Sequence, residues 1–136
     1  MRDGHSDIWT HLVLSSKMHE PIFSPKMIPE IQQALEDFIS QTPNRQGTYC
    51  VLSDHIHLLV KLPPDISINT LANQIQDLVA GRLRQQGHLT NLEWDSDYHA
   101  HSVSLNRLEF EKSLIQRQPL KHQDISLAEE LKFLGM

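Results

Sequence analysis

The chain has a single cysteine, Cys50, which excludes an internal disulfide and is typical of a small core residue on a strand. It has no apolar run long enough to cross a membrane, and its polar N-terminus is not followed by the apolar segment of a secretory signal. We therefore expect a cytoplasmic protein with no membrane partner. The 136 residues, of which 39% are hydrophobic and 21% charged, predict one domain over residues 1–136.

Positive charge is also scarce, since 12 lysines and arginines stand against 17 aspartates and glutamates, for a net charge of −5. Neutralisation of phosphates by lysine and arginine supplies most of the non-specific affinity for nucleic acids. This balance argues against a dedicated nucleic-acid binder, although it leaves room for a local basic groove. Histidines are numerous, at 9, and would make the charge sensitive to mildly acidic pH.

Two of these histidines, His55 and His57, stand one residue apart in an aliphatic run. Alternate side chains of a strand share one face, so both imidazoles would point the same way, with Cα atoms about 6 to 7 Å apart. Two imidazoles so placed can converge on one cation. The pattern is equally typical of polar residues on a solvated sheet face. His11, on another predicted strand, is expected beside this pair of histidines or in a partner interface. A half-buried strand histidine without a ligand role is the favoured interpretation of His11.

Hydrophobic periodicity divides the rest of the chain into strands and helices. A period of two predicts strands over residues 7–15, 45–52 and 94–104, and a further strand from His55 that Pro63 ends. Helical spacing predicts one helix that opens at Pro25 or Pro29 and stops at Thr42, and a second from an N-cap at Ser67 to Gly87.

The order strand, helix, strand, strand, helix, strand predicts an α+β fold, a ferredoxin-like or RRM-like antiparallel sheet with helices packed on one face. Two extra C-terminal helices follow. Asn106 and Glu109 have the spacing of a capping box, which predicts the first of these helices over residues 107–117. Ser126 predicts the start of the second.

Four motifs lie at intervals along this framework. Residues 10–17 read THLVLSSK, residues 54–60 DHIHLLV, residues 98–104 YHAHSVS, and residues 114–118 LIQRQ. Together they resemble the single-tyrosine HUH transposases of the smallest bacterial insertion sequences, including their REP-associated relatives. The resemblance implies DNA transposition by metal-dependent transesterification on single-stranded or hairpin DNA. It also implies a homodimer, in which each catalytic helix lies against the partner's HUH site.

The resemblance implies a divalent metal, Mg²⁺ or Mn²⁺, bound by His55, His57 and Gln118. Imidazoles alone would equally suit Zn²⁺ or Ni²⁺. Because Pro119 disfavours helical backbone at Gln118, a plain surface glutamine remains an alternative to a metal ligand.

The family's nucleophile, a tyrosine four residues before that glutamine, is replaced here by Leu114. A leucine cannot attack phosphorus, so we assign no catalytic residue and expect a protein that is inactive for strand transfer. Tyr98 corresponds to a tyrosine that is structural in the family, and Tyr49 lies on a predicted core strand. Neither is placed to substitute for the missing nucleophile.

The DNA-facing helix of the family carries a Lys-Gly pair where this chain has Gln76 and Asp77. Asp97 replaces a family glycine beside Asp95, and two carboxylates there would repel a phosphate backbone. The candidate nucleic-acid-binding residues that remain are Lys17, Arg82 and Arg84.

Three functions stay open at this point. The first is a transposase-like protein of an insertion sequence that binds single-stranded or hairpin DNA without strand transfer. The second is a dimeric metal-binding or interaction module without DNA activity, which the acidic charge favours. The third is a metal-dependent or histidine-nucleophile hydrolase, although Leu59 breaks the His-x-His-x-His pattern of a histidine-triad enzyme.

Overall fold

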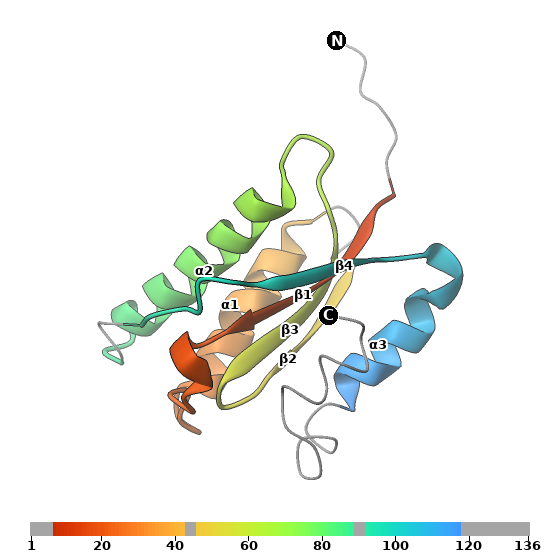
Figure 1. The fold of residues 1–136 in the computed structure, drawn as a ribbon. Coiled ribbons are helices and arrows are strands. Elements are labelled where there is room, and N and C mark those ends of the chain that lie inside the picture. Colours follow the sequence, from red (N-terminus) through yellow and green to blue (C-terminus); the bar gives the residue numbers. More distant parts are fainter. Residues whose placement is uncertain (1–6, 43–45, 89–91, 118–136) are drawn as a thin grey trace.

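The structure is a computed structural model that describes residues 7–42, 46–88 and 92–117 (Figure 1). Within these residues the strands are β1 (Trp9–Ser15), β2 (Gly47–Val51), β3 (His55–Lys61) and β4 (His99–Val103). The α-helices are α1 (Ile28–Ser40), α2 (Ile68–Gln85) and α3 (Leu108–Gln116), and short 3-10 turns cover Lys17–His19 and Leu105–Arg107. The predicted final helix after Ser126 lies outside the described residues.

The four strands form one antiparallel sheet in the order β2-β3-β1-β4. This order, with one helix after β1 and another after β3, is the predicted ferredoxin-like arrangement, and the α+β fold class is confirmed. In the register, His11 of β1 lies opposite Leu59 of β3 on one side and opposite His101 of β4 on the other. The central strand β1 therefore places His11 near the middle of the sheet.

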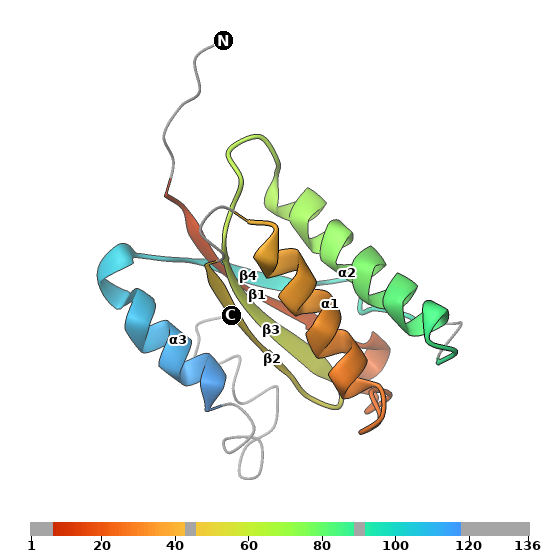
Figure 2. The same ribbon diagram turned by 180° about the vertical axis from the view of Figure 1, so that it is seen from behind.

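Helices α1 and α2 lie together on one face of the sheet, as Figure 2 shows most clearly. Pro29 stands in the first turn of α1, where a missing backbone N–H costs little. The hydroxyl of Ser67 accepts a hydrogen bond from the Thr70 backbone N–H at 3.0 Å, so the predicted N-cap of α2 is confirmed. The large core fills the space between these helices and the sheet, with Leu12, Leu14, Ile31, Leu35, Ile56, Leu58, Leu71, Ile75 and Leu83 fully buried.

Helix α3 packs on the opposite face. Its Ile115 is fully buried in a second cluster with Trp9, Leu59, Val103 and Cys50, which come from all four strands. The helices after β1 and β3 thus share one face as predicted, while the appended helix covers part of the other. Cys50 is a buried core residue, as its position in the sequence indicated.

Two local predictions were wrong. The last strand is confined to His99–Val103, because the Asp97 N–H turns back to the Asp95 side chain at 3.3 Å and Trp94 makes only an isolated bridge to Ser16. The capping box does not form, since Asn106 lies inside a 3-10 turn. Its Oδ1 accepts a hydrogen bond from the Ser104 hydroxyl at 2.7 Å, and α3 begins at Leu108 without a side-chain cap.

None of the helices in the described ranges is both long and apolar enough to cross a membrane.

Candidate metal centre

His55 and His57 of β3 point to the α3 face of the sheet, and their Nε2 atoms lie 3.1 Å apart. The predicted convergence of the two imidazoles is therefore observed. Both residues have 0% exposure, so the alternative of a solvated sheet face is wrong. The face is covered because α3 packs across it and because Leu59, two residues further along the strand, belongs to the apolar cluster under that helix.

The second ring nitrogen of each histidine is also hydrogen-bonded. The Nδ1 atom of His55 lies 2.7 Å from Oδ1 of Asp54, and the Nδ1 atom of His57 lies 2.9 Å from Nε2 of His11. His11 is fully buried, which corrects the expectation of a half-buried strand histidine. Its position follows from the register, since Val13, two residues further along β1, lies directly opposite His57.

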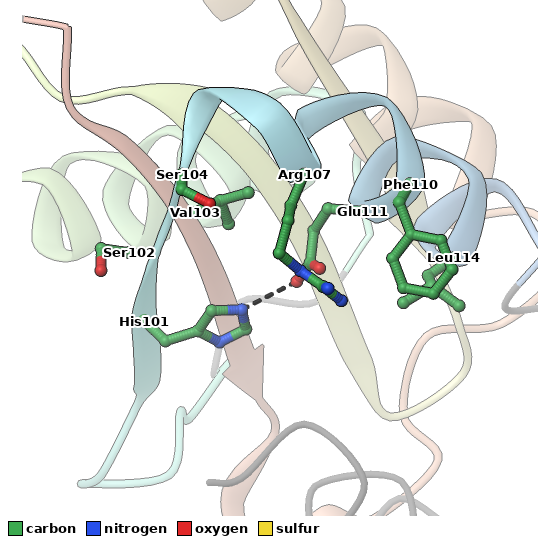
Figure 3. Close-up of a pocket in the computed structure, with 8 residues that line it drawn as sticks. All are labelled: His101, Ser102, Val103, Ser104, Arg107, Phe110, Glu111 and Leu114. Atoms are coloured by element: carbon green, nitrogen blue, oxygen red, sulfur yellow. Dashed lines mark hydrogen bonds and ion pairs between the residues drawn. The ribbon is translucent and has the colours of Figure 1, made fainter.

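Glu111 of α3 completes the chain of hydrogen bonds. Its Oε1 lies 2.8 Å from Nδ1 of His11 and 2.7 Å from Nε2 of His101 on β4 (Figure 3). The hydrogen bond from His11 lowers the pKa of Glu111 to about 2; burial opposes this shift, and the bond from His101 adds to it. Glu111 is therefore an anion at neutral pH, although only 6% of the residue is exposed.

The two carboxylates fix the positions of the imidazole protons. An ionised carboxylate only accepts hydrogen bonds, so His55 donates Nδ1–H to Asp54 and His11 donates Nδ1–H to Glu111. The Nε2 of His11 makes the hydrogen bond to Nδ1 of His57, and the donor of that bond depends on the tautomers of the two rings. The Nε2 atoms of His55 and His57 lie 3.1 Å apart and form the next hydrogen bond of this chain, whose direction depends on the tautomer of each ring.

Two imidazole nitrogens at this separation could bind one cation in place of a shared proton. Histidine ligands of metal ions ordinarily donate their other N–H to a carboxylate or a similar acceptor, which holds the ring and its tautomer. Asp54 does this for His55, while His11, backed by Glu111, does it for His57. The donor set therefore fits a divalent ion. The predicted third ligand, Gln118, lies outside the described residues.

Both the sequence and the fold of the chain match known proteins. A sequence model of the family described as "Transposase IS200 like" matches residues 5–118 of the chain. The chain belongs to this family. A comparison of the chain with curated proteins found no match.

Two solved structures share the fold of this transposase-family chain. A candidate transposase from Deinococcus radiodurans R1 gives a TM-score of 0.61 at 19% sequence identity, over 87% of this chain and 98% of the other. A REP-associated tyrosine transposase bound to a REP hairpin gives a TM-score of 0.59 at 16% identity, over 92% of this chain and 76% of the other. At these identities the likeness shows the fold alone.

Leu114, which the resemblance puts at the position of the family's tyrosine, lies at the edge of a cavity. Leu114 is half-buried and lines, with the flanking ends of β4 and α3, a cavity of about 380 Å³ (Figure 3). The exposed ring of Phe110 lies beside it, with the Arg107 guanidinium 5.0 Å from the ring centroid.

Both described tyrosines belong to the other face of the sheet. Tyr98 and Tyr49 pack against the core cluster under α1 and α2, and the Tyr49 hydroxyl donates a hydrogen bond to Glu36 at 3.0 Å. Burial, and to a smaller degree Glu36, raises the pKa of Tyr49. The tyrosines are thus separated from His55 and His57 by the sheet itself.

Two of the three predicted DNA-binding cations pair with acidic side chains. Arg82 on α2 pairs with Glu30 of α1 at 3.0 Å, and Lys17 pairs with Glu93 at 3.2 Å. Arg84 is exposed on α2, on the face of the sheet away from His55 and His57. Their role in DNA binding stays a prediction.

Proposed function

We propose that this member of the IS200-like transposase family binds a divalent metal and single-stranded or hairpin DNA but does not carry out strand transfer. The observation that carries the proposal is an intact, oriented pair of imidazoles, His55 and His57, on the same face as a helix that has Leu114 at the position of the family's tyrosine.

A divalent ion in this site would polarise a phosphate oxygen of the DNA. His55 and His57 would hold it through Nε2, with Gln118 as the proposed third ligand and Mg²⁺ or Mn²⁺ as the proposed ion. Asp54 and His11 hold the ring orientations, so that the two Nε2 atoms already lie 3.1 Å apart. The remaining positions would be open to water or phosphate, which favours weak binding in the absence of DNA.

The nucleophile is the missing part. A covalent intermediate needs a hydroxyl in line with the leaving oxygen, and the side chain of Leu114 has none. Removing the nucleophile from an enzyme typically removes most of its rate, while binding and electrostatics remain. The protein would therefore recognise DNA without cutting it.

The sharpest test restores the hydroxyl. Leu114→Tyr, Leu114→Phe and the wild type are each mixed with a single-stranded hairpin and Mn²⁺, and covalent protein–DNA adducts are read on a denaturing gel. We expect an adduct from Leu114→Tyr alone, because phenylalanine supplies the ring without the hydroxyl. An adduct from the wild type would contradict the proposal. If Leu114→Tyr binds metal and DNA yet forms no adduct, the acidic residues Asp77, Asp95 and Asp97 are the next candidates for a second loss.

A second candidate function is a dimeric metal-binding or interaction module without DNA activity. It is favoured by the net charge of −5 and by the ion pairs that engage Arg82 and Lys17. A gel shift with the same hairpin at low salt separates the two functions. A shift supports the DNA binder, and the absence of any shift at micromolar protein supports the module.

A further inference from the structure

Glu111 lies at the centre of a second group of potential metal ligands. The ligand atoms of His11, His101 and Glu111 all lie within 4.8 Å of one another. We propose that these three residues form a second metal site, distinct from the one at His55 and His57, and that it takes Zn²⁺.

The donor set supports this choice. Two imidazoles and one carboxylate form a ligand set that zinc enzymes use when they leave a fourth position open. Glu111 is 6% exposed and lies on α3, the helix that packs on the apolar cluster of Trp9, Val103 and Ile115. A carboxylate is costly to bury as an anion, and a bound cation would offset that cost.

The site also has an approach from solvent. His101 and Glu111 line the cavity of about 380 Å³ beside Arg107 and Leu114 (Figure 3). The side chain of His101 is 28% exposed, whereas that of His11 is 0% exposed. An ion could therefore enter from the cavity, with His11 as its innermost ligand and water in the fourth position.

A metal here would fasten three elements to one another. His11 comes from β1, His101 from β4 and Glu111 from α3. The ion would fix α3 against the sheet, and with it Leu114, which follows Glu111 by one turn of the helix.

The hydrogen bond between His11 and His57 makes the two metal sites compete. A metal at His57 Nε2 leaves the ring proton on Nδ1, which points at His11. A metal at His11 Nδ1 leaves that ring's proton on Nε2, which points back at His57. With both ions present, two N–H groups would meet across 2.9 Å, so one neutral pair of rings cannot serve both ions at once.

The test isolates the second site by removing the first. Full-length protein with His55→Ala and His57→Ala is titrated with Zn²⁺ by calorimetry. We expect one Zn²⁺ per chain, and at least a tenfold loss of affinity when His101→Ala is added. His99→Ala, on the same strand and also partly buried, is the matched control and should bind as the double variant does. Equal Zn²⁺ binding with and without His101 would overturn the proposal.

Two further measurements complete the test. If circular dichroism shows that the alanine background is unfolded, His55→Gln with His57→Gln replaces it, with the same expected results. The wild type should bind one Zn²⁺ per chain, and a stoichiometry of two would overturn the competition between the sites. Because the second site is read without His55 and His57, failure here is distinguishable from failure of the proposed function.

Discussion

At the scale of single residues, the orientation of the His55 and His57 rings depends on two carboxylates. Asp54 acts on His55 directly, while Glu111 acts on His57 through His11. A buried carboxylate that only accepts hydrogen bonds leaves each neighbouring imidazole one choice of tautomer. Loss of either carboxylate should therefore affect metal binding at His55 and His57 without removing a ligand of that site.

Glu111 predicts a specific dependence of stability on pH. Its pKa falls from 4.5 to about 2 on folding, so its contribution is fully present above pH 4.5 and is lost as pH falls towards 2. A shift of this size corresponds to on the order of 3 kcal/mol. Urea unfolding at pH 7 and pH 3 should show a smaller loss of stability for Glu111→Gln than for the wild type. Glu109→Gln, on the same helix but with an 88% exposed side chain, should behave as the wild type; equal pH dependence in all three proteins would contradict this role.

The sequence predicted the pair of histidines, and His11 beside that pair or in a partner interface, but it predicted neither the burial of His11 nor its bond to Glu111. The period of two in a strand suffices to put His55 and His57 on one face. The burial of His11 depends on which strands pair and in which register, and local periodicity does not contain that information. Glu111 carried one usable signal, because it precedes the buried Ile115 by four residues and so shares its helix face. A lone acidic residue on an apolar face indicates a buried partner.

At the scale of elements, α3 is the helix that covers the sheet face carrying His55 and His57. Ile115 is its fully buried apolar side chain. Truncation of such a side chain typically costs about 2 to 5 kcal/mol. We expect Ile115→Ala to lower the free energy of unfolding by this amount, while Gln116→Ala, on the exposed side of the helix, changes it by less than about 0.5 kcal/mol. Equal effects in denaturant melts would show that α3 is not docked on the sheet as the structure has it.

Strand and helix types followed from periodicity, whereas the boundaries depended on local hydrogen bonds. The start of α2 was predicted because Ser67 can cap it alone. The start of α3 was not predicted correctly. The capping box needs the Asn106 side chain to accept a backbone N–H, but that side chain accepts a hydrogen bond from the Ser104 hydroxyl instead. A rule based on residue spacing does not account for such competition between nearby polar side chains.

At the scale of the whole molecule, β2 and β4 are the edges of the sheet. Exposed edges favour association with another strand, and the resemblance to dimeric transposases adds to this expectation. We predict a homodimer at micromolar concentration, to be measured by small-angle scattering or sedimentation. A monomeric mass under these conditions would contradict the prediction.

Charge sets the expected strength of DNA binding. With a net charge of −5 and few cations to contact phosphates, binding to a hairpin should be weak and should fall with salt. Two or three phosphate contacts on a single strand would give a log–log salt slope of about −1 to −2. Fluorescence anisotropy at several salt concentrations measures this slope. Tight binding at physiological salt would reveal a basic surface that these residues do not account for.

The central claim is that His55 and His57 are metal ligands held ready by their hydrogen bonds, and calorimetry with Mn²⁺ tests it most directly. The account predicts weak binding of Mn²⁺ to the wild type and its loss in the variant with both His55→Ala and His57→Ala. Asp54→Asn should weaken binding while both ligands remain, by roughly 10- to 100-fold, the usual effect of removing such an outer partner. Mn²⁺ binding that is unchanged by the two alanine substitutions would contradict the account.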